Sequence, residues 1–219
     1  PGDGAYVTIA RRYQHVLARD GIDLIIRETG GSAENAELIA AGEVDVAILQ
    51  GGVAVPGTGD AVEAIGAIFF EPMIFLTHQD ALVSANPARW KNLRISKGQQ
   101  GSGTAAAFAD FERALGIAPD ANIHVGLSYS ESVEALARHE IDMAVFVSQI
   151  DAPYLKQAFL HTEIHHLTLD HVDAISRRLE YANTVTMPAG AISLLPVIPY
   201  DRLDGVLARI EAGPRPLAL

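Results

Sequence analysis

Cysteine is absent from the 219-residue sequence, which excludes disulfide bonds, thiol redox pairs and thiolate metal sites. Basic residues are scarce as well, because 16 lysines and arginines stand against 27 aspartates and glutamates, for a net charge of −11 at pH 7. This charge argues against nucleic acid or an anionic membrane surface as a partner. No apolar run reaches the ~18 residues of a membrane span, since the longest candidate, residues 64–77, is interrupted at Glu71 and Pro72.

A glycine-rich turn, residues 97–103, lies between a short predicted strand, Leu93–Ser96, and a predicted helix that begins at Thr104 and ends at Gly116. The helix has an apolar face, because its apolar residues recur at helical spacing: Ala107, Phe108, Phe111 and Leu115. A turn of this kind leaves backbone N–H groups free at the helix N-terminus, where the helix dipole favours an anion. We therefore predict a carboxylate or phosphate site at residues 101–104. An ordinary N-cap by Ser102 or Thr104 is the alternative.

Two well-known catalytic turns do not match this stretch. A phosphate-binding P-loop needs a lysine after its last glycine, but Gly103 is followed by Thr104 and Ala105. A nucleophile elbow needs glycines two residues before and after its serine, but Ser102 has Gln100 and Thr104 there. No other spacing in the chain indicates a catalytic triad or a carboxylate dyad. We therefore expect a protein without catalytic residues, and not an enzyme.

The first part of the chain alternates between helix and strand signals. Residues 6–19 predict an amphipathic helix, and residues 32–41 predict a second helix capped by Ser32. Residues 22–27 and 44–49 are apolar runs that are typical of buried strands in a parallel sheet.

The same order of elements returns 97 residues later. Residues 35–47 align with residues 132–144 without gaps. The identical pairs are Glu37/Glu134, Ala40/Ala137, Glu43/Glu140, Asp45/Asp142 and Ala47/Ala144. The preceding helix and strand of each copy keep nearly the same offset. We infer an α/β fold of two lobes, each with parallel strands, and a ligand cleft beyond the carboxyl ends of those strands.

The predicted domain boundaries follow from this repeat. Lobe one is expected at residues 1–76, with part of residues 190–219 returning to it, and lobe two at residues 77–189. The β-prone run at residues 65–77, broken at Glu71 and Pro72, is interpreted as the crossover between the lobes. Lobe one has no strand before Pro1, so we expect its first strand upstream of this sequence, with truncation at both ends.

Several motifs together identify a family resemblance. They are PGDGAY at residues 1–6, ETGGSAEN at 28–35, AGEVDVAILQGG at 41–52, FFEPMIF at 69–75, GQQGSGT at 98–104 and YANTVTMPAG at 181–190. With these motifs the chain resembles the TAXI-type solute-binding proteins of TRAP transporters, which have a type II periplasmic-binding-protein fold. The resemblance implies a periplasmic or extracytoplasmic protein, its signal peptide or anchor removed, that captures a carboxylate or amino acid for a membrane permease without a cofactor.

A different function for the same fold stays open. A ligand-sensing receptor domain of a membrane signalling protein would use the same two lobes. A flanking membrane helix joined to a kinase or cyclase domain would favour the sensor, whereas an upstream lipobox or signal peptide would favour the transport protein.

The candidate ligand-binding residues lie in the loops at the expected strand ends. They are Tyr6, Ser32, Asn35, Gln50, Phe70, Glu71, Ser102, Gly103, Thr104, Ser130 and Phe146. For Phe70 and Phe146 a place in the hydrophobic core is the alternative. The Glu71 carboxylate is costly to bury unless it is paired, so it is expected to bind either hinge backbone or a ligand amine.

Histidines gather late in the chain, at positions 161, 165, 166 and 171. Zinc needs three or four converging ligands, and adjacent residues on a strand, such as His165 and His166, point to opposite faces. We therefore predict no metal site there.

Overall fold

A computed structural model of the protein describes residues 5–57, 61–179, 181–185 and 208–210. The helices are α1 Ala5–Leu17, α2 Ser32–Ala40, α3 Gly103–Leu115, α4 Tyr129–Ala137, α5 Pro153–Ala158 and α6 Val172–Ser176, with 3-10 turns η1 Ala18–Asp20 and η3 Pro87–Arg89. The strands are β1 Glu71–His78, β2 Arg94–Ser96, β3 Ile123–Val125, β4 Met143–Val147, β5 Ile164–His166, β6 Ala182–Thr184 and β7 Ala208–Ile210. Apart from β7, the predicted return of residues 190–219 to lobe one lies outside the described residues.

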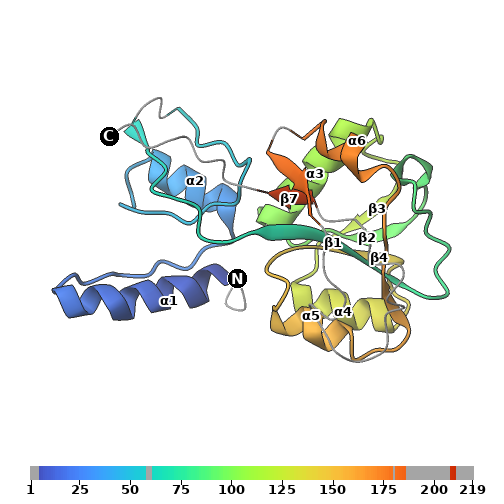
Figure 1. Cartoon of the computed structure of the whole chain (residues 1–219), viewed down its shortest axis with the longest axis horizontal. Coiled ribbons are helices and arrows are strands. Elements are labelled where there is room, and N and C mark those ends of the chain that lie inside the picture. Colours follow the sequence, from blue (N-terminus) through green and yellow to red (C-terminus); the bar gives the residue numbers. More distant parts are fainter. Residues whose placement is uncertain (1–4, 58–60, 180, 186–207, 211–219) are drawn as a thin grey trace.

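All described strands form one mixed sheet in the order β3-β2-β4-β1-β7-β6, with β5 also paired to β1 (Figure 1). Strand β2 runs parallel to β3 and β4, whereas β1 is antiparallel to β4, β5 and β7. Every residue of β1 is buried, because strands flank it on both sides and helices cover both faces of the sheet. The parallel strands predicted in the second copy of the repeat are thus confirmed as β2, β3 and β4, and the run interpreted as a crossover adds the antiparallel strand β1.

The residues of β1 alternate between two hydrophobic clusters, one on each face of the sheet. Ile74 and Leu76 pack with α4 and α5, while Met73 and Phe75 pack with α3 and α6. Figure 1 shows the same arrangement, with α4 and α5 on one side of the sheet and α3 and α6 on the other. The chain is therefore a mixed α/β sheet with helices on both faces.

The crossover run contains the central strand of this sheet. The predicted break at Glu71 and Pro72 is where β1 begins. Proline is tolerated at such a strand start because little of the ladder depends on its missing N–H group. The prolyl carbonyl still accepts a bond of 3.3 Å from the Ser148 N–H.

The strands predicted at residues 22–27 and 44–49 are wrong for the described structure, in which neither segment is a strand. Side chains hold these segments instead: the Gln14 side chain donates to the Leu24 carbonyl, and the Asn35 side chain donates to the Ile48 carbonyl. The side chains of Ile25 and Val46 are 85% and 59% exposed. An apolar run becomes a strand only where another strand completes its hydrogen-bond ladder, and no described segment pairs with either run.

Two helix ends were predicted with different success. Gly116 ends α3 in the left-handed conformation, with φ of 67°, and Ser102 caps its start by accepting from the Ala105 N–H at 3.2 Å. The capping role predicted for Ser32 is wrong, because the cap of α2 is Gly31. Ser32 lies in the first turn, where its hydroxyl accepts from the Gln50 N–H at 3.0 Å.

Candidate functional site

One edge of the sheet collects the loops that the sequence singled out. The parallel strands β2, β3 and β4 all end at this edge, and helices α3 and α4 begin there. Strand β1 starts at the same edge, because it is antiparallel to β4 and its Met73 lies opposite Val147. Glu71 therefore stands at the carboxyl ends of the parallel strands, where open α/β sheets bind their ligands.

Tyr6 and Glu71 form the most strongly perturbed pair at this edge. The Tyr6 hydroxyl donates to Glu71 Oε2 at 2.7 Å, and the Tyr6 ring meets Phe69 edge-on with centroids 6.0 Å apart. Burial raises the pKa of Glu71 to about 7, against the opposing effect of the Tyr6 hydrogen bond. Burial, and next the charge of Glu71, raise the pKa of Tyr6. Near neutral pH Glu71 can therefore act as either a donor or a charged acceptor.

A cavity of about 80 Å³ opens beside this pair. Tyr6 and Glu71 supply its polar end, and its other walls are Ala47, Ile48, Leu49, Gly51, Gly66, Ala67, Ile68 and Phe69. The cavity has room for only a few water-sized groups as it stands. A ligand of amino-acid size would need the loops around it to move apart.

The loop before α2 and the loop before α3 touch each other. A Cβ atom added at Gly31 would lie 3.1 Å from the Cα atom of Ser102, and one added at Gly103 would lie 2.0 Å from Gln50 Oε1. A side chain at position 103 would therefore have to displace the end of the Gln50 side chain. The loop predicted to bind an anion, residues 101–104, and the loop before α2 are thus brought together, with Gln50 lying against the start of α3.

Thr104 has a different environment from the one expected of a ligand contact. It is 1% exposed, and its hydroxyl accepts from the Val147 N–H at 3.3 Å. The same hydroxyl lies 2.6 Å from the Tyr129 hydroxyl, which donates to the Val147 carbonyl at 3.0 Å. Since Tyr129 uses its proton on that carbonyl, Thr104 donates to Tyr129. Thr104 thus fixes Tyr129 and the end of β4.

Some of the remaining candidate residues lie near the edge of the sheet where the parallel strands end, and others lie away from it. Asn35 accepts from the Thr29 hydroxyl and holds the Ile48 carbonyl, so it shapes the loop before α2. Ser130 is half-buried in the first turn of α4, and Phe70 is 51% exposed. Phe146 is fully buried in the hydrophobic core, as the alternative interpretation held.

Sequence reasoning missed Tyr129 and Phe69. The internal repeat contained a signal for Tyr129, because the offset of 97 residues places it at the position of Ser32. Both residues lie in the first turn of their helix and bond the backbone at repeat-equivalent positions, Gln50 and Val147. Phe69 follows from no pattern, since its contact with Tyr6 depends on how α1 is placed.

The late histidines do not converge. His165 and His166 lie on β5, and His161 lies 3.4 Å from Glu163. Burial lowers the pKa of His166 to about 4. Among the described residues, the only group of three side chains placed to hold a metal ion is elsewhere, at His78, Asp80 and His139. None of the described helices is long and apolar enough to cross a membrane.

Solved structures share this fold. SsuA, the periplasmic aliphatic sulphonate binding protein of Escherichia coli, has 16% identity and a TM-score of 0.50, covering 78% of this chain and 58% of SsuA. A protein of Bordetella bronchiseptica RB50 has 18% identity and a TM-score of 0.55, covering 76% and 53%. An ancestral arginine-binding protein bound to arginine has 14% identity and a TM-score of 0.50, covering 72% and 66%.

The fold is therefore that of the type II periplasmic-binding proteins, as the resemblance implied. The chain spans 58% of the length of SsuA and 53% of the Bordetella protein. It belongs to the NMT1-like family, whose model matches residues 5–194. No curated protein matches the chain.

Proposed function

We propose that this chain is the extracytoplasmic solute-binding component of a TRAP-type transporter, and that it captures a small carboxylate or amino acid for the membrane permease. The observation that carries the proposal is the meeting of the loops before α2 and α3 at the ligand-binding edge of the sheet, beside the Tyr6–Glu71 pair. The motifs at residues 28–35, 41–52, 69–75 and 98–104, which resemble TAXI-type proteins, supply these loops and Glu71.

The start of α3 supports a ligand that carries a carboxylate. Helix N-termini present free N–H groups and a positive dipole end. Gln50 lies against this start, so a ligand carboxylate would replace the Gln50 side-chain oxygen close to Gly103. Moving the flexible end of a glutamine side chain costs less than moving backbone.

Glu71 supports an amino acid within that class. A ligand ammonium group beside Glu71 would favour the charged carboxylate and offset part of the cost of burying it. A simple carboxylate would instead require Glu71 to be protonated, which a pKa of about 7 allows near neutral pH. An amino acid would thus place one charge at each end of the site.

Binding without turnover fits the roles of the local hydroxyl groups. The Ser102 hydroxyl accepts a hydrogen bond as the cap of α3, and the Thr104 hydroxyl is hydrogen-bonded to the Val147 N–H and the Tyr129 hydroxyl. Among the described residues, neither of these two hydroxyl groups bonds a histidine or carboxylate that could act as its general base.

A thermal-shift screen of organic acids, amino acids, sulfonates and sugars tests this function. We expect carboxylates or amino acids to raise the melting temperature, because they bind the folded chain alone. The bound compound should be recovered chemically unchanged after long incubation. Stabilisation by sugars alone would contradict the proposal.

A further inference from the structure

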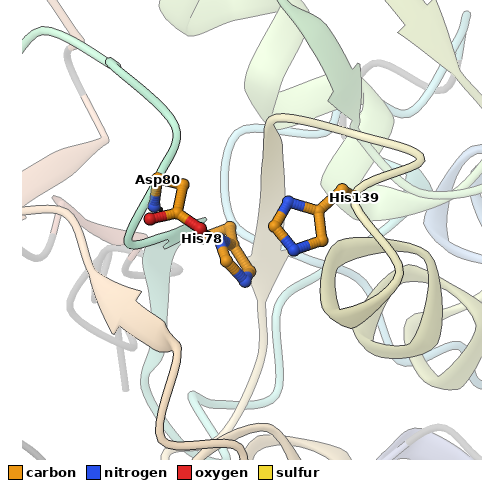
Figure 2. A group of neighbouring side chains, drawn as sticks. All are labelled: His78, Asp80 and His139. Carbon is orange, nitrogen blue, oxygen red and sulfur yellow. Dashed lines mark hydrogen bonds and ion pairs between the residues drawn. The ribbon is translucent and has the colours of Figure 1, made fainter.

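A second cluster of polar side chains lies at the opposite end of β1 from Glu71. His78 is the last residue of β1, Asp80 lies in the turn that follows, and His139 lies directly after α4. One potential ligand atom from each of the three residues lies within 4.8 Å of the others. Figure 2 shows the two imidazole rings facing each other, with the Asp80 carboxylate beside His78.

The spacing of His78 and Asp80 fits coordination to one ion. His78 Nδ1 and Asp80 Oδ2 are 3.5 Å apart, close to the separation of two ligands that each lie ~2.1 Å from a tetrahedral ion. The rings of His78 and His139 have centroids 3.6 Å apart at an interplanar angle of 48°, closer than the roughly 5 Å expected of two imidazoles on one tetrahedral ion, so binding would turn the exposed His139 ring outward. The Asp80 N–H donates to His78 Nδ1 at 3.2 Å, and an ion at that nitrogen would replace this contact.

Two of the ligands are held in place by the fold. His78 is 4% exposed, which leaves its ring little freedom. A tight turn positions Asp80: the Gln79 N–H donates to the Glu163 carbonyl at 2.8 Å, and the Ala81 N–H donates to the His78 carbonyl at 2.9 Å. The ends of β1 and β5 thus fix the His78 ring and the backbone position of Asp80 before any ion binds.

The third ligand occupies a backbone position that ordinarily favours glycine. His139 has a φ of 58°, in the left-handed region where a side chain is costly. The internal repeat aligns His139 with Gly42, which ends α2 in the same way with a φ of 68°. The second copy of the repeat therefore has a strained histidine at a helix end where the first copy has glycine. The imidazole of this histidine lies against the ring of His78.

We propose that His78, Asp80 and His139 bind a divalent ion of the Zn²⁺ class, with water completing the coordination. Two imidazoles and one carboxylate suit Zn²⁺, whereas Mg²⁺ and Ca²⁺ prefer oxygen ligands alone. Strand β1 spans eight residues, so the cluster lies roughly 23 Å from Glu71 and is separate from the solute site. The ion would tie the end of β1 to the end of α4.

Calorimetric titration of the whole chain with ZnCl₂ tests this site. We expect binding of one ion per chain, and no comparable heat with MgCl₂. His139→Gly should weaken Zn²⁺ binding by at least about tenfold, because it removes one ligand. Glycine is favoured at this φ, so the variant should fold. Asp80→Asn, at an exposed position, should weaken binding in the same direction.

His161→Gln is the matched control, because His161 and Glu163 form a pair without a third ligand among the described residues. It should bind Zn²⁺ like the original chain. In a thermal-shift measurement, Zn²⁺ should raise the melting temperature of the original chain and of His161→Gln but not of His139→Gly. Equal Zn²⁺ affinity in His139→Gly and the original chain would overturn the proposal, as would the absence of Zn²⁺ binding to the original chain.

Discussion

The two copies of the repeat have similar sequences and different structures. Val46 and Met143 occupy equivalent positions, yet Val46 is 59% exposed and Met143 is fully buried in β4. Asp45 and Asp142, which are identical in the two copies, differ in the same way. Asp142 accepts from the Arg94 backbone N–H and guanidinium at 2.7 Å, whereas Asp45 is exposed. The comparison teaches that apolar patterning selects candidate strands, and a neighbouring strand decides which of them form.

The largest expected difference between the copies is in their apolar side chains. Phe146→Ala should lower the free energy of unfolding by about 3–5 kcal/mol, because Phe146 is fully buried between β4 and the helices α4 and α5. The equivalent change Leu49→Ala, at a half-buried position, should cost about 1 kcal/mol or less. Urea unfolding of both variants measures this difference. Equal losses would show that the first copy of the repeat is packed as tightly as the second.

Glu71, which lies between the two copies of the repeat, should make the free energy of unfolding depend on pH. The pKa of Glu71 is raised to about 7 in the folded chain, so the folded state binds the proton more tightly than the unfolded state does. Stability is therefore fully present below the unfolded pKa of about 4.5 and is lost as pH rises through about 7, by roughly 2–3 kcal/mol.

Urea unfolding at pH 5 and pH 8 tests this dependence. Glu71→Gln should remove most of the loss, because glutamine has no proton to release. Glu28→Gln, at an exposed ion pair with Arg11, is the control and should keep the pH dependence of the original chain. The same pH dependence in Glu71→Gln would assign the effect to another group.

A smaller effect is expected at the start of α3. Thr104→Val should lower the free energy of unfolding by about 1–2 kcal/mol, because the buried Val147 N–H and Tyr129 hydroxyl lose a partner. Thr104→Ser keeps the hydroxyl and should retain most of the stability. Affinity for the ligand should change little in both variants. A large loss of affinity with unchanged stability would instead make Thr104 a ligand contact.

The smallest expected effect concerns the two left-handed helix ends. Gly42→Ala should cost about 1 kcal/mol through backbone strain alone, since an added Cβ at Gly42 meets nothing within 4 Å. His139→Gly should gain up to about 1 kcal/mol in metal-free buffer. Thermal unfolding of both variants measures these shifts. A loss of stability in His139→Gly without metal would indicate that the His78–His139 ring contact is itself stabilising.

Much of the structure of residues 94–147 could be predicted from the sequence, because local signals and tertiary contacts agree there. The strand at residues 94–96, the helix ended by Gly116 and the Ser102 cap all depend on short-range patterns. The central position of β1 could not be predicted, because it depends on antiparallel pairing with segments far away in the chain. The internal repeat aligned parallel units only.

The candidate site could be predicted in outline and not in its contacts. The sequence indicated the loops around Ser32 and Ser102, since both open helices after small polar turns. The hydrogen bond between the Thr104 and Tyr129 hydroxyl groups depends on how α3, α4 and β4 pack together, and no residue spacing in the sequence encodes that packing. The contact between His139 and His78 could not be predicted either, because it depends on how the end of α4 packs beside the end of β1.

The most direct test of the account is calorimetric titration of the amino acid or organic acid selected by the thermal-shift screen. We expect 1:1 binding to the original chain and to Glu28→Gln. In Glu71→Gln we expect a loss of affinity of about tenfold or more for an amino acid, whose ammonium group loses its charged partner. A simple carboxylate should bind Glu71→Gln at least as tightly as the original chain, because a buried negative charge is removed. The absence of any carboxylate or amino-acid ligand, or an amino-acid affinity that is the same in Glu71→Gln and Glu28→Gln, would contradict a solute site beside Tyr6 and Glu71.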